Sequence, residues 1–226
     1  MKKSIAIICE YVIFPERIGG MDRFFKAYDL ALKRENYNPV WFFKDVTEFE
    51  FYENLDIISA ENKGIETFFL EYCSSNNLKF DYVITHFLQP VSPFFKEIKQ
   101  LMNSKIINVD HNPRPLNGFT LKKRLKNKVK GFLYGKYVDK LVGVSAYTTK
   151  HIINDFGSHL KKRSTTIYNG IDVFDYKKQE LNRLELPIKF LVVSHLRESK
   201  GIQDLLLALN QIDKKSQKNI VIDIYG

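Results

Sequence analysis

Short apolar segments alternate with helix-length segments along the chain, and this alternation constrains the fold more than any other feature. A continuous apolar run such as Ser4–Cys9 is typical of a strand that is buried on both faces of a sheet. Strands separated by helices build a parallel, doubly wound α/β sheet. The predicted strands are residues 4–9, 39–43, 55–59, 81–85, 105–109, 140–144 and 165–168, and the predicted helices are residues 21–34, 65–73, 94–102, 121–137 and 145–156.

A change of composition after residue 171 indicates a second domain. Residues 172–187 are charged and polar, which is typical of a linker. A strand at Ile188–Val193, a helix that opens at Lys200-Gly201 and a strand at Ile220–Tyr225 follow. Such a unit cannot cover its own sheet, so we expect the chain to end inside its second domain. The predicted parts are a complete Rossmann-like domain over residues 1–171, a linker over 172–187 and an incomplete second Rossmann-like domain over 188–226.

The composition excludes several classes of protein. The chain holds 18 Phe and 12 Tyr residues, too many for a disordered protein. Its two cysteines, Cys9 and Cys73, are too few for a disulfide framework or a zinc site. Apolar runs stay far below the roughly 20 residues that a membrane-spanning helix needs. We therefore expect a cytoplasmic protein, either soluble or peripheral on the inner face of the cell membrane.

The net charge of +9 is concentrated in one segment. Residues 121–140 carry eight basic side chains and one acidic, whereas residues 45–71 carry eight acidic and one basic. Leu121, Leu125 and Val129 recur at helical spacing, which predicts an amphipathic helix with a lysine-rich outer face. A solvated helix face and an anionic membrane surface both fit this pattern. The residues predicted to face a membrane are Lys122, Lys123, Arg124, Lys126 and Lys130.

Glycines and histidines follow several predicted strands, where doubly wound sheets bind their ligands. Gly19-Gly20 stands before a helix and lets a phosphate or sugar approach the backbone, although a plain turn explains the pair more simply. His111 can donate a hydrogen bond, act as a general base or be satisfied within its loop. His86 has the same placement and the same alternatives.

A second candidate site follows the first strand of the second domain. Arg197 and Lys200 lie in the segment Ser194–Gly201, just before a predicted helix. Two cations beside a helix N-terminus can hold a diphosphate. An exposed charged loop is the alternative, because Glu198 offsets part of the positive charge.

Four short motifs occur in the order found in one family. Residues 19–23, Gly-Gly-Met-Asp-Arg, resemble the Gly-Gly-x-Glu-Arg opening of bacterial GT-B glycosyltransferases of retaining family 4. Val144-Ser145 is similar to the Val-Ser element of that family. Residues 167–172 resemble its Tyr-Asn-Gly-Ile-Asp junction between domains, and residues 194–201 resemble its Gly-Arg-Leu-x-x-x-Lys-Gly element. The resemblance covers nearly all of the chain.

The resemblance implies two Rossmann-like domains that face each other across a cleft. The first would bind a glycan or lipid-linked acceptor and the second a nucleotide sugar, with no metal or other cofactor and no nucleic-acid partner. Gly20, beside Gly19, would approach the donor phosphates, and His111 would be the catalytic residue that contacts the transferred sugar. The diphosphate would be held by His195, Arg197, Lys200 and Gly201, and the domain junction would contain Asn169, Gly170 and Asp172.

Three departures from the family keep other functions open. Asp22 stands where the family has Glu, and Ser194-His195 where it has Gly-Arg. The family's paired glutamates, which hold the donor, belong to a part of the C-terminal domain beyond Gly226. A second hypothesis is therefore a non-catalytic remnant that binds an acceptor or a membrane. A third is a membrane-surface or nucleic-acid binder unrelated to sugars, which rests on residues 121–140 alone.

Overall fold

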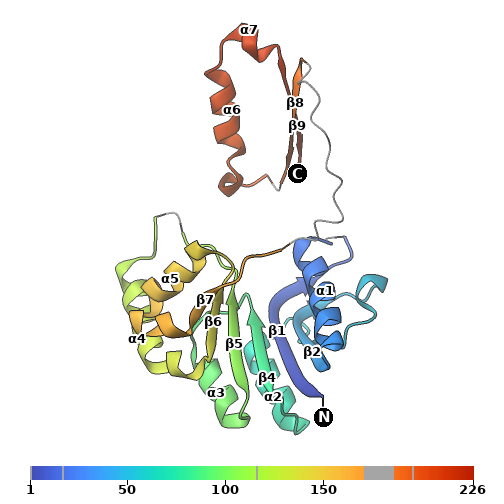
Figure 1. Ribbon diagram of the computed structural model, residues 1–226, viewed down its shortest axis with the longest axis vertical. Coiled ribbons are helices and arrows are strands. Elements are labelled where there is room, and N and C mark those ends of the chain that lie inside the picture. The colour runs from blue at the N-terminus through green and yellow to red at the C-terminus, as the bar shows by residue number, and fades with distance from the viewer. Residues whose placement is uncertain (1, 17, 116, 171–185, 195) are drawn as a thin grey trace. The chain divides into compact units, whose positions relative to one another are not determined.

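The protein divides into two compact units, Met1–Gly170 and Ile171–Gly226. A computed structural model describes residues 2–16, 18–115, 117–170, 186–194 and 196–226 (Figure 1). Most of the segment predicted as a linker, and the motif residues Asp172 and His195, lie outside the described residues.

The first unit is built on a seven-stranded, all-parallel sheet with the order β3-β2-β1-β4-β5-β6-β7. This arrangement confirms the α/β, doubly wound architecture expected from the alternating pattern. β1 is longer than its apolar run, because pairing with β2 resumes after an irregularity between Cys9 and Val12. The strands are β1 Lys3–Ile13, β2 Tyr37–Val46, β3 Ile57–Ser59, β4 Tyr82–His86, β5 Lys105–Asp110, β6 Lys140–Gly143 and β7 Ser164–Thr166.

Helices connect successive strands of this unit and begin close to the residues that the sequence indicated. Ser145 caps α5, accepting a hydrogen bond from the Thr148 amide at 3.1 Å, which satisfies one of the free amides of the first turn. The helices are α1 Gly20–Arg34, α2 Ile65–Ser75, α3 Pro93–Leu101, α4 Leu121–Tyr134 and α5 Ala146–Phe156, and short 3-10 helices occupy Glu50–Tyr52, Gly135–Tyr137 and Ser158–Arg163.

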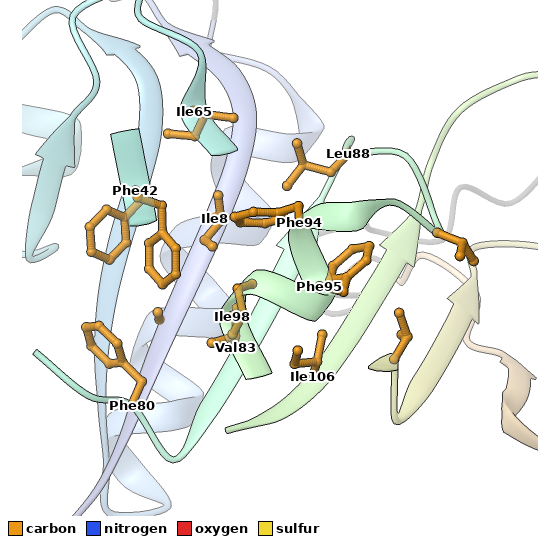
Figure 2. Packing of buried hydrophobic residues seen from close by; sticks show 14 of the residues in the cluster. Ile8, Phe42, Ile65, Phe80, Val83, Leu88, Phe94, Phe95, Ile98 and Ile106 are labelled. Carbon is orange, nitrogen blue, oxygen red and sulfur yellow. The ribbon is translucent and has the colours of Figure 1, made fainter. Parts of the chain in front are cut away.

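Two hydrophobic clusters lie on opposite faces of the sheet. One joins alternate residues of the central strands, such as Ile8 and Phe42, to α2, α3 and α5 (Figure 2). The other joins the intervening residues, such as Ile7 and Trp41, to Phe25 of α1. Successive residues of a strand point to opposite faces, so a strand that is apolar throughout supplies both clusters. Helices on both faces hold the sheet rigid beneath the loops at its carboxyl edge.

The basic side chains of α4 other than Lys130 are exposed, as expected for a lysine-rich outer face, but the apolar stripe of the helix is not buried. Its buried residues are Asn127 and Gly131, whereas Leu121, Leu125 and Phe132 are exposed by 80%, 68% and 79%. A Cβ atom at Gly131 would collide with the Phe156 backbone, so α4 approaches α5 along its glycine side. This close contact turns the apolar stripe of the helix outward, between its basic side chains.

The second unit has a strand–helix–strand fold. β8 Ile188–Val193 and β9 Ile220–Tyr225 form a two-stranded parallel sheet, connected through α6 Ile202–Asn210 and the short α7 Lys214–Gln217. Gly201 precedes α6 with a φ of +70°, a left-handed conformation that favours glycine. Within residues 186–194 and 196–226, no residue is buried. Both its strands and its helices therefore present apolar side chains to solvent.

Candidate functional site

The strand order of the first unit reverses at its centre. The chain runs from β1 outward to β3 and then returns to β4 on the other side of β1. Loops diverge at such a switch point, and doubly wound proteins bind ligands in the crevice beyond the strand ends there. The glycine pair stands between β1 and α1 at the start of that helix, His86 is the last residue of β4, and His111 directly follows β5.

Asp22 organises the loop between β1 and α1. This carboxylate is 1% exposed and accepts hydrogen bonds from the Gly19 amide at 2.7 Å, the Tyr11 hydroxyl at 3.1 Å and the Tyr52 hydroxyl at 2.5 Å. Burial and the neighbouring Asp22 carboxylate raise the pKa of Tyr52 well above its ordinary value, so Tyr52 stays protonated and continues to donate. An acidic residue in the first turn also favours the helix terminus. Residue 22 therefore holds the loop through its carboxylate, although it is Asp where the family has Glu.

The fold itself does not require glycine at residues 19 and 20. A Cβ atom at Gly20 would meet nothing within 4 Å, and one at Gly19 would meet only Asp22 Oδ2 at 3.5 Å. Gly19 has an ordinary φ of −110°, and Gly20 is not among the glycines with a left-handed φ. By contrast, Gly131 and Gly143 are required by close packing. The open space at Gly20 lies at the positive end of α1, where a ligand anion could approach the backbone amides.

His86 and His111 form a hydrogen-bonded pair across the ends of β4 and β5. His86 Nδ1 lies 2.9 Å from His111 Nε2. Burial of His86, together with the nearby His111, lowers the pKa of His86 to about 3. Burial lowers the pKa of His111 to about 4, although the Asp110 carboxylate acts in the opposite direction. Both imidazoles are therefore neutral near pH 7, and His111 is suited to hydrogen bonding rather than to carrying a positive charge.

Phe87 connects the histidine pair to the glycine loop. Its ring stacks on His111 with centroids 4.5 Å apart and on Tyr11 with centroids 5.7 Å apart. Its φ is +64°, a strained conformation for a bulky residue, and the Asn112 side chain donates to its carbonyl at 3.2 Å. Because Tyr11 also donates to Asp22, a continuous set of contacts joins Gly19 to His111.

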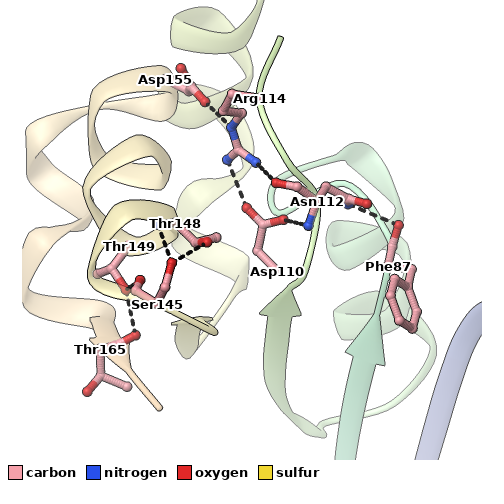
Figure 3. Close-up of polar contacts among 9 residues, drawn as sticks. All are labelled: Phe87, Asp110, Asn112, Arg114, Ser145, Thr148, Thr149, Asp155 and Thr165. Atoms are coloured by element: carbon pink, nitrogen blue, oxygen red, sulfur yellow. Dashed lines mark hydrogen bonds and ion pairs between the residues drawn. The ribbon is translucent and has the colours of Figure 1, made fainter. Parts of the chain in front are cut away.

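A buried charge network fixes the loop that carries His111 (Figure 3). Arg114 bridges Asp110 and Asp155, with an N–O distance of 2.8 Å to each carboxylate. It also donates to the Asn112 carbonyl at 2.7 Å, while the Asn112 amide donates to Asp110 at 3.0 Å. Side-chain exposures of 6% for Arg114 and 0% for Asp110 make this a desolvated pair, which is costly to break. The network holds the residues on both sides of His111 in place.

A cavity of about 660 Å³ opens beside this site, at the ends of β2 and β3. Its lining includes Glu48, Glu50, Glu53, Phe49 and Tyr52. Tyr52 therefore contributes both to the cavity wall and to the support of Asp22.

The remaining predicted site residues lie away from the histidine pair in the first unit or belong to the second unit. Asn169 and Gly170 are exposed at the end of the first unit. Arg197 and Lys200 are exposed around the short 3-10 helix Glu198–Lys200, and the left-handed φ explains the glycine at residue 201. Arg197, Lys200 and Gly201 therefore belong to the second unit, whereas the glycine pair belongs to the first.

The predicted membrane-facing residues separate into two sets. Lys122, Lys123, Arg124 and Lys126 are exposed. Lys130 instead donates to Gln89 Oε1 at 2.7 Å, and its pKa is lowered by burial and by the nearby Lys126 and Lys123. Lys130 is thus held against the body of the unit rather than presented on the outer face of α4.

Sequence patterns missed three contributors to the site: Phe87, Arg114 and Tyr52. Arg114, between two prolines, and Phe87, after a strand-end histidine, could have been noted from their positions. The role of Tyr52 depends on contact with a residue thirty positions away, which no local pattern reveals. The described residues hold no cluster of three or more His, Cys, Asp or Glu side chains arranged for a metal ion. Likewise, no helix in the described part of the chain is long and apolar enough to cross a membrane.

Comparison with known proteins shows similarity at the level of the fold. The sequence matches no family model. It matches no curated protein. The structure is similar to that of a glycosyltransferase from Rickettsia africae, with a TM-score of 0.56 and 14% identity over 100% of this chain and 69% of that one. It is also similar to WaaG, a glycosyltransferase involved in lipopolysaccharide biosynthesis, with a TM-score of 0.62 and 10% identity over 97% of this chain and 62% of that one.

These comparisons confirm the fold class expected from the sequence motifs. At such low identity the similarity shows the Rossmann-like fold of GT-B glycosyltransferases and not a shared activity. The chain spans less than two thirds of the length of WaaG.

Proposed function

We propose that this chain belongs to a retaining glycosyltransferase that moves a hexose from a nucleotide sugar to a glycan or lipid-linked acceptor in bacterial surface polysaccharide synthesis. The observation that carries the proposal is the glycine pair, which the fold does not require, linked through Asp22, Tyr11 and Phe87 to the His86–His111 pair at the switch point of the sheet. The fold shared with two glycosyltransferases and the ordered sequence motifs support the same assignment.

The proposed chemistry assigns roles to both units. The backbone at Gly20 approaches the donor phosphates, and the neutral His111 contacts the transferred sugar. Arg197, Lys200 and His195 bind the diphosphate and stabilise the charge that develops on the leaving group. The proposed reaction uses no metal ion.

The cavity at the ends of β2 and β3 is the proposed acceptor site. It lies at the carboxyl edge of the same sheet as His111, and its volume of about 660 Å³ is in the range of small-molecule pockets. The carboxylates of Glu48, Glu50 and Glu53 are hydrogen-bond acceptors suited to sugar hydroxyls, and Phe49 and Tyr52 offer apolar surface.

Sugar transfer by the native full-length protein tests the proposal. Gly20→Val should lower kcat/KM for a nucleotide sugar by 10-fold or more, on the order of the loss of one transition-state contact, because its side chain would fill the space reserved for phosphate. Gly64→Val is the matched control, since Gly64 also lies at a helix start with nothing within 4 Å of a Cβ atom. Equal activity of the two variants would contradict the donor assignment. Binding of an acceptor without sugar transfer would support the non-catalytic module instead.

We also propose that α4 holds the protein on an anionic membrane surface, at the cytoplasmic face. Leu121, Leu125 and Phe132 form an exposed apolar stripe, and Lys122, Arg124, Lys126 and Lys128 are exposed on the same helix. Apolar insertion combined with electrostatic attraction, worth about 1 kcal/mol for each basic residue near the surface, is how amphipathic helices bind such membranes. A lipid-linked acceptor would be presented at this surface.

Co-sedimentation with vesicles of phosphatidylglycerol or phosphatidylcholine tests this placement. Binding should require the anionic lipid and weaken with salt. Replacing Lys122 and Lys126 with Glu should reduce binding more than replacing Lys161 and Lys162, which are exposed elsewhere and change the net charge equally. Equal losses would show a nonspecific charge effect. Tighter binding to an oligonucleotide, with a steep salt dependence, would favour the nucleic-acid alternative.

A further inference from the structure

The ring of His86 has an incomplete set of hydrogen bonds. His86 is 2% exposed, and its Nε2 atom is buried without a partner. The rings of Phe24 and Phe25 lie edge-on to it, with centroids 5.8 Å and 6.3 Å away. Its other nitrogen, Nδ1, lies 2.9 Å from His111 Nε2. The polar contact of this side chain is therefore directed at one atom of the candidate site.

His111 has the complementary arrangement. Its Nε2 atom is engaged by His86, and its Nδ1 atom makes no hydrogen bond within the described residues. Nδ1 is also not among the buried polar atoms without a partner, so solvent reaches it. It is thus the nitrogen of the pair that a ligand can contact.

Two neutral imidazoles can form this hydrogen bond in two ways. Either His86 Nδ1–H donates to His111 Nε2, or His111 Nε2–H donates to His86 Nδ1. The first arrangement leaves a bare lone pair buried at His86 Nε2 and an N–H exposed at His111 Nδ1. The second buries an N–H without an acceptor and exposes a bare lone pair.

The surroundings favour the first arrangement. Donors buried without an acceptor are rarer in proteins than under-satisfied acceptors. The buried, partnerless Nε2 atom of His86 therefore places the exposed N–H on His111.

We infer that His86 is a positioning residue that donates from Nδ1 to His111 Nε2 and so fixes His111 as the tautomer that presents an Nδ1–H donor to the ligand. This inference rests on the proposed function for the identity of the ligand, a sugar. His111 then recognises a sugar or phosphate oxygen that accepts a hydrogen bond, and it does not remove a proton. His86 acts through His111 and does not touch the substrate.

Nitrogen chemical shifts in long-range ¹H–¹⁵N spectra of the labelled full chain test the tautomer directly. The protein has five histidines, which substitution of each in turn assigns. At pH 7 the His111 Nε2 resonance should have the shift of an unprotonated nitrogen and Nδ1 that of a protonated one. The reverse pattern would overturn the inference, whatever the enzyme activity.

Matched variants test the positioning role. In His86→Asn the amide nitrogen replaces Nδ1, whereas in His86→Gln it replaces Nε2; His86→Leu has neither. Leu and Gln should lower kcat by about 10- to 100-fold, the range for residues that orient an active group, with a smaller change in KM. Asn should recover part of this loss and preserve the His111 tautomer. Thermal melting verifies that all three variants fold.

The outcomes separate this inference from the proposed function. If Asn and Gln lose kcat equally while both remain folded, His86 has only a packing role. If the wild type shows the expected tautomer but transfers no sugar from any nucleotide sugar tried, the proposed function fails and the tautomer assignment stands.

Discussion

The two units of this protein share a strand–helix–strand pattern but differ in how much they bury. In the first unit Phe42 on β2 is 0% exposed, whereas Phe190 on β8 of the second unit is 50% exposed. Both residues lie in apolar parallel strands. Phe42 is covered because α2 and the residues before β4 pack against it, and these segments come later in the chain. A local pattern therefore specifies the strand, while burial depends on elements far away in sequence.

The loops that follow β1 and β8 show the same contrast at the level of a site. Asp22, Tyr11 and Tyr52 fix the first loop through hydrogen bonds. The second presents Arg197 and Lys200 to solvent. Pre-organised groups cost less to order when a ligand binds, so the first loop is the better prepared of the two.

Truncation of matched phenylalanines should give the largest difference between the units. Phe42→Ala should lower the free energy of unfolding of the first unit by about 3–5 kcal/mol, because it removes a buried ring and leaves a cavity. Phe190→Ala should change the free energy of unfolding by less than about 0.5 kcal/mol. Urea unfolding followed by tryptophan fluorescence measures this, since the single tryptophan, Trp41, is fully buried in the first unit. Similar losses of unfolding free energy in the two variants would contradict the difference in burial between Phe42 and Phe190.

Breaking ion pairs should give the next largest difference. Arg114→Met leaves the Asp110 carboxylate buried without its partner, which should cost about 3–5 kcal/mol. Lys44→Met breaks the pair with Glu10, whose side chains are 38% and 36% exposed, and should change the free energy of unfolding far less, because solvent screens this pair. The same urea titration compares them. A small effect of Arg114→Met would show that the network does not fix the His111 loop.

The histidine pair makes the stability of the first unit depend on pH. Histidines of an unfolded chain titrate near pH 6.5, whereas burial lowers the pKa values of His86 and His111 to about 3 and 4. Above about pH 6.5 both states hold neutral rings and pH has no effect through this pair. As the pH falls from there towards 3, the unfolded chain binds protons that the folded chain does not, so stability decreases.

Urea midpoints at pH 7, 6 and 5 measure this dependence. The double variant His86→Leu, His111→Leu should have a flatter profile than the wild type between these values. An unchanged slope would assign the dependence to other groups.

A glycine substitution should give the smallest difference. Gly201→Ala forces a side chain into the left-handed region and should weaken the start of α6 by about 1–2 kcal/mol. Hydrogen exchange of the α6 amides reports this change, with Gly64→Ala, at φ −60°, as the control. Faster hydrogen exchange in the control but not in Gly201→Ala would contradict the claim that the left-handed Gly201 supports the start of α6.

Much of the fold could be predicted from the sequence because it depends on local periodicity. The apolar runs placed every strand of the first sheet within a few residues, and Ser145 gave the start of α5. The orientation of α4 could not be predicted this way. Its apolar stripe has the spacing of a buried face, yet the contact between Gly131 and the Phe156 backbone decides which side packs.

The sequence by itself determined the α/β class, the order of the elements and the positions after strands where chemistry could occur. Only the tertiary structure brought Gly19, His86 and His111 into one set of contacts and left His111 with one free nitrogen. The physical reason is the separation along the sequence over which each kind of contact acts. Helix and strand patterns repeat over a few residues, whereas the contacts of Asp22, Phe87 and Arg114 join residues up to 76 positions apart, through a sheet that reorders the chain.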